Sequence, residues 1–237
     1  MRNTWLIARR ELASYFTSPI AYAVTAVFLV IVGYFFGLIL YYSREATMRY
    51  LFYNVTTFLL LIGPALTMRL LAEEHKAGTI ELLLTSPVRD GEVVVGKFLA
   101  ALVLWALMLA LTLVYPLLLK LFGNPDPGPI ASGYLGLLLA GGAVLALGVV
   151  ASSLTSNQVI AALVAFGLSL MLWLTDAVQG LVSGPVGSFF SYLSMSLHFD
   201  DFPKGVIDTK DVAFFLTIMV AALFVATRIL ETRRWKP

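Results

Sequence analysis

The chain has 237 residues, of which 59% are hydrophobic and only 13% are charged. Soluble domains contain about 45–50% apolar and about 25% charged residues, so this composition excludes an ordinary soluble protein. An aromatic content of 13% excludes a disordered chain, and the absence of cysteine excludes a disulfide scaffold. A formal net charge of +2 is too small to indicate a nucleic-acid partner. The composition predicts an all-α, polytopic integral membrane protein.

Five charge-free stretches predict six spans, because a helix needs about 20 mostly apolar residues for a hydrocarbon core of about 30 Å and residues 127–175 are long enough for two helices. The predicted spans lie near residues 20–42, 50–68, 98–119, 134–154, 157–175 and 212–228. The small polar stretch 152–158 predicts the hairpin between the fourth and fifth spans, and residues 176–211 form a long outer loop. We therefore expect a single transmembrane domain over residues 1–237.

The Lys and Arg residues are unequally divided between the two sides of the membrane. With a cytoplasmic N-terminus, the inner segments hold Arg2, Arg9, Arg10, Arg69, Lys76, Arg89, Lys97, Arg228, Arg233, Arg234 and Lys236. The outer segments then hold only Arg44, Arg49, Lys120, Lys204 and Lys210. Cytoplasmic segments carry the excess of Lys and Arg, so we expect a multi-pass protein of the cell (inner) membrane with both termini in the cytoplasm. No cleaved signal peptide is expected.

Residues 1–19 precede the first span and carry an amphipathic helical pattern. At about 100° per residue, one arc gathers Trp5, Ala8, Leu12, Tyr15 and Phe16. Arg10 lies on the opposite side and Arg9 on the flank. This pattern indicates an interfacial helix, with Trp at the headgroups and Arg toward anionic lipid. A ragged cytoplasmic start to the first span is the alternative.

Residues 69–97, between the second and third spans, form the most informative segment. Ile80 and Leu83 share one face of a short helical pattern with Glu81 beside it, and Pro87 stops this helix. An apolar-faced helix outside the membrane needs a surface to cover it. An interfacial helix on lipid and a docking helix for a soluble partner both fit this pattern.

The run from Glu73 to Val88 reads Glu-Glu-His-Lys-Ala-Gly-Thr-Ile-Glu-Leu-Leu-Leu-Thr-Ser-Pro-Val and follows the second of six predicted spans. In that position it resembles the cytoplasmic motif of ABC-2 type permeases, the transmembrane subunits of ATP-driven exporters. Residues 198–211 resemble the outer loop of the gliding-motility-type branch. With the six-span layout, the resemblance covers nearly the whole chain.

The resemblance implies a permease subunit that forms the translocation path and is not an enzyme. It implies no cofactor in this chain, with ATP and Mg²⁺ bound by a partner. The implied partners are two ABC ATPase subunits, a second permease (a copy of this chain or a sister chain), membrane lipids and an accessory protein with an outer domain. No polar constellation in the spans identifies the transported substrate.

The resemblance also assigns roles to residues. It makes the N-terminal segment an elbow helix, carried by Trp5, Arg9, Arg10, Leu12 and Phe16. It places a coupling helix, which seats in a groove of the ATPase, within residues 78–85. The residues it assigns to coupling are Glu73, Glu74, Gly78, Thr79, Ile80, Glu81 and Leu83. Glu73 and Glu74 would extend the second span into the cytoplasm, and Gly78 would permit the bend that follows.

Two other function classes remain open. One is an ATP-independent membrane scaffold or accessory subunit. The other is an intramembrane enzyme, since membrane metalloproteases use Glu pairs and His ligands, but His75 and His198 are predicted on opposite sides of the membrane and zinc needs three or four convergent ligands. Between their bounding charges the spans hold no ionisable residue, which disfavours coupling to an ion gradient and favours an external energy source.

Residues 91–97 match the first seven positions of a phosphate-binding loop, G-x-x-x-x-G-K, but Phe98 replaces the Ser or Thr that would hold Mg²⁺. We expect these residues to start a span instead. Asp90 is then the expected N-cap, Glu92 favours the positive end of the helix, and Lys97 snorkels to the headgroups.

Small residues and prolines predict how the spans pack. Close approach of helices is predicted at Gly33, Gly37, Gly133, Gly136, Gly141, Gly142 and Gly148, either within the chain or at a seam between subunits. Pro64 and Pro116 predict kinks.

In the outer loop, the apolar stretch 188–197 is too short to cross, and Asp200, Asp201, Asp208 and Asp211 predict a solvated acidic surface.

Overall fold

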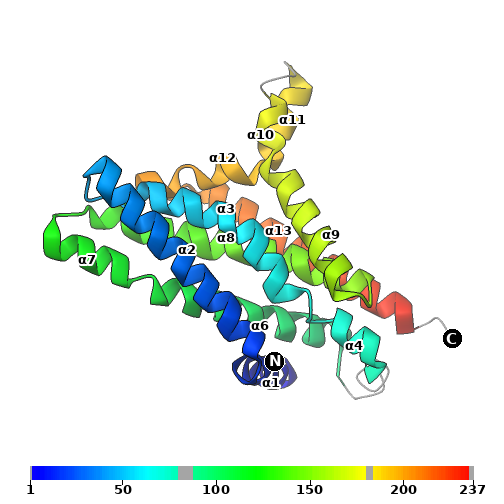
Figure 1. Ribbon diagram of the computed structural model, residues 1–237. Helices are drawn as coiled ribbons and strands as arrows, with labels where there is room; N and C mark the ends of the chain where they lie inside the picture. The colour runs from blue at the N-terminus through cyan, green and yellow to red at the C-terminus, as the bar shows by residue number, and fades with distance from the viewer. Residues whose placement is uncertain (1, 80–87, 180–183, 235–237) are drawn as a thin grey trace.

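The computed structural model describes residues 2–79, 88–179 and 184–234, and all regular structure within these ranges is helical (Figure 1). Six of its helical stretches are long and apolar enough to cross a membrane. They are α2 (Pro19–Ser43), α3 (Arg49–Thr67) with α4 (Ala72–Ala77), α6 (Asp90–Leu111) with α7 (Val114–Phe122), α8 (Pro127–Leu154), α9 (Gln158–Trp173) and α13 (Thr209–Arg234). The structure confirms the all-α fold class with six candidate spans.

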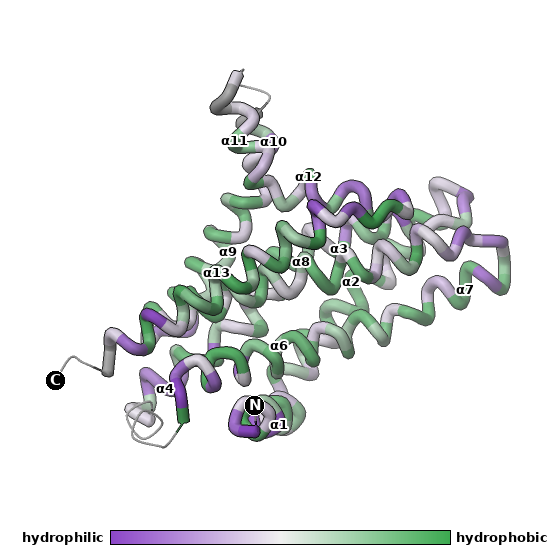
Figure 2. Tube along the Cα trace, turned by 180° about the vertical axis from the view of Figure 1, so that it is seen from behind, coloured by the Kyte–Doolittle hydropathy of each residue, from purple (hydrophilic) through white to green (hydrophobic). Residues whose placement is uncertain are grey.

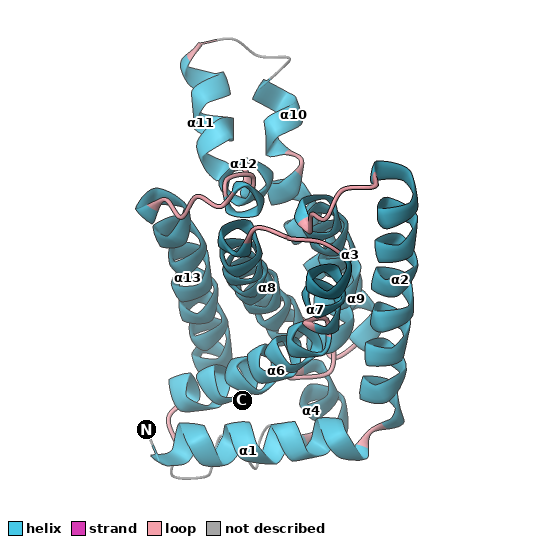
Figure 3. Cartoon of the chain, turned by 90° about the vertical axis from the view of Figure 1, so that its left-hand side faces the viewer, coloured by secondary structure: helices cyan, strands magenta, loops and turns pink. Residues whose placement is uncertain are grey.

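The bundle has two distinct ends. Helix α1 (Arg2–Thr17) lies across one end, roughly perpendicular to α2, α8 and α13, and α4 lies at the same end (Figure 3). We call this end the base. The opposite end, the top, carries α10 (Thr175–Gln179), α11 (Pro185–Leu193), α12 (Met195–Phe199) and the short 3₁₀ helix η1 (Phe202–Lys204). The predicted loop 176–211 is therefore largely helical in its described part.

Hydropathy follows this arrangement. The long helices are mainly hydrophobic along their lengths, whereas hydrophilic residues gather at α4 and in the connections beside α12 (Figure 2). The apolar stretch 188–197 is divided by Ser194, whose Oγ accepts a hydrogen bond from the Leu197 N–H at 3.2 Å and caps α12. Two short helices therefore replace the one apolar segment that the sequence suggested.

Several helix boundaries differ from the predicted spans. Helix α6 begins at Asp90, so its first turns are residues 90–97, as expected for residues that start a span, and the helix is longer than the predicted span 98–119 at this end. The N-cap of α6 is Arg89, not Asp90, and the Glu92 carboxylate accepts a hydrogen bond from the Arg89 N–H at 3.2 Å. Helix α8 begins at Pro127 rather than near 134, because Asp126 caps it there.

The central helix is α8, in which 78% of the most apolar stretch is buried, against 11% for α2. A side chain on five of its six glycines, all but Gly128, would collide with a neighbouring helix or with η1. The facing pairs are Gly133 with Phe52, Gly136 with Phe202, Gly141 with Trp105, Gly142 with Met219, and Gly148 with Thr67. These glycines therefore serve packing within the chain. In α2, by contrast, no atom of the residues that the structure describes lies within 4 Å of a Cβ built on Gly37.

Two spans are interrupted. The third predicted span breaks between α6 and α7, where Pro116 lacks the N–H that would bond to the Thr112 carbonyl. The Tyr134 hydroxyl donates to that carbonyl instead, at 3.0 Å. The second predicted span breaks between α3 and α4, four residues after Pro64 and within residues 68–71. Glu73 and Glu74 therefore lie on a separate short helix rather than on a continuous extension of α3.

Candidate functional site at the base

A buried ion triad joins three helices at the base. Lys97 of α6 has a side chain only 1% exposed, and its Nζ lies 2.9 Å from Glu11 Oε1 of α1 and 2.8 Å from Glu74 Oε1 of α4. The prediction that Lys97 snorkels to the headgroups is therefore wrong. Desolvating an ammonium group is costly unless a carboxylate pairs with it, and here two carboxylates do so. The triad ties Glu74 of α4, one of the predicted coupling residues, to α1 and to α6.

The triad is open on one side. The second carboxylate oxygen of Glu74, Oε2, is buried and has no hydrogen-bond partner within the described part of the chain. Glu74 lines a cleft of about 250 Å³ between α1 and α4. The cleft is lined by Arg10, Glu11, Ser14, Arg69, Leu70, Glu73, Glu74, Ala77, Thr79 and Lys97. Six of these ten residues are charged, so the cleft suits a polar or ionic partner rather than an apolar one.

Helix α1 packs closely over the start of α6. A Cβ on Gly96 would lie 2.9 Å from the Ile7 side chain and 2.9 Å from the Thr4 carbonyl oxygen, so only glycine allows this approach. The Asn3 side chain adds a hydrogen bond to the Glu92 carboxylate at 3.2 Å. Gly96 and Lys97, which gave the sequence its phosphate-loop appearance, thus hold α1 in place. Residues 91–97 are helical, so they form no loop that could wrap a phosphate.

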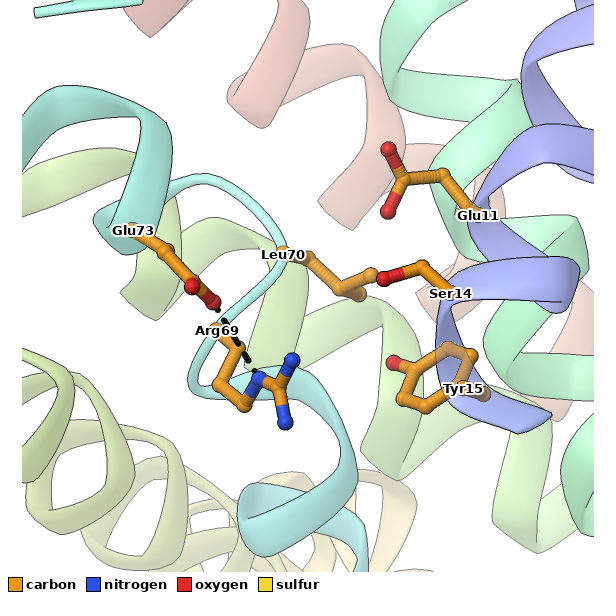
Figure 4. Close-up of a pocket in the computed structure, with 6 residues that line it drawn as sticks. All are labelled: Glu11, Ser14, Tyr15, Arg69, Leu70 and Glu73. Atoms are coloured by element: carbon orange, nitrogen blue, oxygen red, sulfur yellow. Dashed lines mark hydrogen bonds and ion pairs between the residues drawn. The ribbon is translucent and has the colours of Figure 1, made fainter. Parts of the chain in front are cut away.

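The second anchor of α1 lies at the break below α3. The Tyr15 hydroxyl donates to the Leu66 carbonyl oxygen at 2.6 Å, and Arg69 Nη1 donates to Ser18 Oγ at 2.7 Å. Burial raises the pKa of Tyr15, which keeps its hydroxyl protonated and able to donate. Arg69 also pairs with Glu73 at 3.2 Å on one side of a small cavity of about 40 Å³, which Glu11, Ser14 and Tyr15 of α1 line on the other side (Figure 4).

The structure divides the apolar arc predicted for the elbow helix. Ala8 and Tyr15 are buried against the bundle, and Leu12 packs partly against the core. Trp5 and Phe16 point outward, with exposed fractions of 66% and 45%. Arg9 and Arg10 are also exposed. Helix α1 therefore presents one apolar face to the bundle and two large aromatic side chains to its surroundings.

The predicted coupling residues are only partly described. Glu73 is exposed, Glu74 is in the triad, and Gly78 ends α4 in the left-handed region with φ of 68°. That backbone conformation favours glycine and turns the chain sharply after α4. Thr79 is exposed at the end of this turn. The remaining predicted residues, Ile80, Glu81 and Leu83, lie outside the described residues.

The top carries a separate polar cluster. His198 Nδ1 lies 2.7 Å from Asp211 Oδ1, and the His198 ring stacks on Phe214 with centroids 3.9 Å apart. Asp211 is 1% exposed, so the prediction of a solvated carboxylate is wrong at this position. Asp200 is hydrogen-bonded to Lys204 and to the Tyr53 hydroxyl. This cluster closes the top of the bundle around α12 and η1.

The two histidines lie at opposite ends of the bundle, His75 in α4 at the base and His198 in α12 at the top (Figure 1). In the described ranges, no three His, Asp or Glu residues come together in a group that would hold a metal ion. The charged groups described at the two ends form ion pairs between helices, Lys97 with Glu11 and Glu74 at the base and His198 with Asp211 at the top.

Sequence reasoning missed Glu11, Tyr15 and Lys97 as residues of the base. Lys97 was the only one with a usable signal, since a lysine inside an otherwise apolar helix start needs either solvent or an anion. Its partner Glu11 lies 86 residues earlier in the chain, and nothing in the local pattern connects the two.

The helices and the charged base define a multi-pass membrane protein. The family model for ABC-2 family transporter proteins matches residues 5–233. The chain therefore belongs to the ABC-2 transporter family, whose members are membrane transport subunits. A comparison with curated proteins found no match.

Proposed function

We propose that this chain is the permease subunit of an ATP-driven exporter and that its base docks a separate ATPase. The observation that carries this proposal is the Lys97 triad, which locks α4 to α1 and α6. The segment with the family motif begins in α4 and continues past Gly78. A soluble partner that binds this segment would therefore be linked through the triad to three helices, α4, α1 and α6. Two ATPase subunits and a second permease complete the proposed assembly, with ATP and Mg²⁺ on the ATPases.

The proposed mechanism is mechanical. ATP closes the ATPase pair, and the motion enters through residues 78–85 on the far side of the Gly78 turn. Because Glu74 is held by Lys97, a push on α4 is shared with the elbow helix and the third span. The spans then change their packing as rigid bodies, which needs no chemistry in this subunit. Between their bounding charges the predicted spans hold no Asp, Glu, Lys, Arg or His, which supports an energy source outside the membrane.

In this proposal the base faces the cytoplasm and the top faces outward. The excess of Lys and Arg in the base segments supports this orientation. The outward aromatic residues Trp5 and Phe16 suit contact with lipid headgroups and chains, while Arg9 and Arg10 suit anionic headgroups. The gliding-motility-type assignment adds an accessory protein with an outer domain, for which α10 and α11 at the top are the nearest surface.

The first test is co-purification of the tagged chain from solubilised membranes. We expect an ATPase with a complete phosphate-binding loop to co-purify. Glu81→Lys reverses a charge in the coupling segment, so the ATPase should dissociate or lose stimulation while the chain still inserts. The matched control is Glu45→Lys, an exposed residue at the opposite end, which should leave the complex intact. If wild-type chain recovers no ATPase, the scaffold alternative is favoured.

The second test is topology. Because the chain has no cysteine, single Thr79→Cys and Val206→Cys variants each carry one unique thiol. Thr79 is exposed at the base and Val206 is exposed beside η1 at the top. A membrane-impermeant maleimide should label only the Val206→Cys variant in intact cells. Labelling of the Thr79→Cys variant from outside would overturn the docking proposal.

A further inference from the structure

A buried serine on α8 holds the break between α3 and α4. Ser152 is 0% exposed, and its Oγ accepts hydrogen bonds from the Leu71 and Ala72 N–H groups, each at 3.0 Å. It donates in turn to the Met68 carbonyl oxygen at 3.2 Å. The first N–H groups of a helix have no partner within that helix, and a serine from a distant part of the chain satisfies them here. The start of α4 is thus bonded directly to α8.

A second buried serine makes the equivalent connection at the other end of α8. Ser132 is 2% exposed, and its Oγ lies 2.7 Å from the Phe202 carbonyl oxygen of η1 and 2.9 Å from the Gly128 carbonyl oxygen of its own helix. The Phe202 ring also fills the space beside Gly136, where a Cβ would come within 2.6 Å. The short helix η1 at the top is thus bonded directly to α8.

Between these two serines α8 is a single uninterrupted helix. It has no internal proline or break, whereas the spans α3–α4 and α6–α7 are both interrupted. Close contacts at Gly141, Gly142 and Gly148 leave little room for α8 to bend relative to its neighbours. Of these three paths from base to top, α8 is the one that forms a single continuous helix.

We propose that Ser152 and Ser132 are positioning residues that make α8 the transmission rod between the base and the top. Displacement of α4 moves α8 through Ser152, and α8 moves η1 through Ser132. The functional meaning rests on the proposed ATPase docking, because that partner would displace α4. The physical linkage itself concerns only this chain, and it is measurable without a partner.

Hydrogen–deuterium exchange of the full chain in lipid nanodiscs tests this linkage. In Ser152→Ala, we expect the amides of residues 68–72 to exchange about 3- to 10-fold faster, as a lost hydrogen bond requires. The diagnostic result is a parallel increase at residues 202–206, at the far end of the molecule. Ser132→Ala should give the reciprocal increase at residues 68–72.

The matched control is Ser153→Ala. Ser153 is also 0% exposed and adjacent in sequence, but among the described residues its Oγ bonds only to the Val150 carbonyl oxygen of the same helix, at 2.7 Å. It should change neither distant segment. If Ser152→Ala accelerates exchange only around residues 68–72, or if Ser153→Ala matches its distant effect, the rod proposal is wrong. If Ser152→Ala does not fold, amide exchange at residues 68–72 in Ser132→Ala tests the proposal independently.

A second measurement uses the ATPase complex. The unique thiol of Val206→Cys should change its maleimide labelling rate when nucleotide is added, and Ser152→Ala should abolish that change while Ser153→Ala preserves it. The rod proposal is wrong if nucleotide still changes the labelling rate in the presence of Ser152→Ala. It is also wrong if nucleotide does not change the labelling rate of the Val206→Cys variant itself. Failure to recover any ATPase overturns the proposed function instead, and the exchange experiment then decides the rod on its own.

Discussion

Trp105 lies in the space that a side chain at Gly141 would need. A Cβ built on Gly141 would come within 2.0 Å of Trp105 Nε1, and that indole N–H donates to the Leu137 carbonyl oxygen at 3.0 Å. Trp105 is fully buried, so the indole has nowhere to move without breaking this hydrogen bond. The pair fixes how α6 crosses α8 at the centre of the bundle.

We expect Gly141→Ala to destabilise the fold by about 1–3 kcal/mol, the usual cost of overpacking a core. The measurement is thermal unfolding of the detergent-solubilised chain. Gly37→Ala is the matched control, because nothing lies within 4 Å of a Cβ on Gly37. Equal losses of stability in the two variants would contradict the packing assignment.

The Lys97 triad predicts a charge-specific effect. Lys97→Met leaves the partly buried carboxylates of Glu11 and Glu74 without their cation, and removing one partner of a fully buried ion pair costs about 3–5 kcal/mol, an upper bound here. We expect a large loss of stability and detachment of α1, seen as faster proteolysis near residue 18. The double variant Lys97→Met/Glu74→Gln should recover part of this loss, because one uncompensated charge is gone. No recovery would show that Lys97 acts by packing alone.

The Tyr15 anchor predicts a smaller effect. Tyr15→Phe removes the donor to the Leu66 carbonyl, which should weaken the attachment of α1 by about 0.5–1.5 kcal/mol. Amide exchange in residues 66–72 reports this change. Tyr22→Phe is the control, since the Tyr22 hydroxyl donates to the Phe16 carbonyl in an exposed position. An effect as large in Tyr22→Phe would argue against a specific anchor.

The top predicts a pH dependence through Asp200. Burial alone would raise the pKa of this carboxyl, but hydrogen bonds from Lys204 and Tyr53 hold the pKa below its ordinary value. A lowered pKa means that the carboxylate form stabilises the fold above the unfolded pKa of about 3.9 and that this contribution is lost as pH falls through the lower folded value.

We therefore expect thermal stability to fall below about pH 4 in the wild type, with a smaller fall in Asp200→Asn, which is less stable at neutral pH. Because the carboxylate is partly exposed, salt should weaken the difference. Glu45→Gln, in an exposed position at the same end, should follow the wild-type profile. A pH profile unchanged by Asp200→Asn would remove Asp200 from this role.

The six-span architecture could be predicted because membrane crossing depends on local composition. Charge-free length, together with Pro19 and the polar stretch 152–158, predicted six spans, and Pro116 correctly indicated the interruption of the third. The stretch 152–158 does contain the turn between α8 and α9, at residues 155–157, but α8 continues to Leu154 and Ser152 is buried within it. A buried serine differs from a turn serine only by its partners, here Met68, Leu71 and Ala72, which lie about 80 residues away.

The candidate site was harder to predict for the same reason. The motif identified Glu74 and Gly78, and the structure places both at the base. It could not identify Glu11 as a partner of Lys97, because such a pair depends on how α1 crosses α6. That crossing depends on Gly96, because only a residue without a side chain allows α1 to approach so closely. In the sequence, Gly96 instead suggests part of a phosphate-binding loop.

The uneven burial of the spans has a consequence for biosynthesis. Helix α3 is the least apolar of the six candidate spans and one of the most buried, while α2 is the most apolar and the least buried. Much of the protein surface that covers α3 comes from α8, which the ribosome makes later. Because α8 is synthesised after α3, we infer that α3 inserts into the bilayer before its main neighbour is present. Until α8 is synthesised, α2 or the insertion machinery would cover the face of α3 that α8 later contacts.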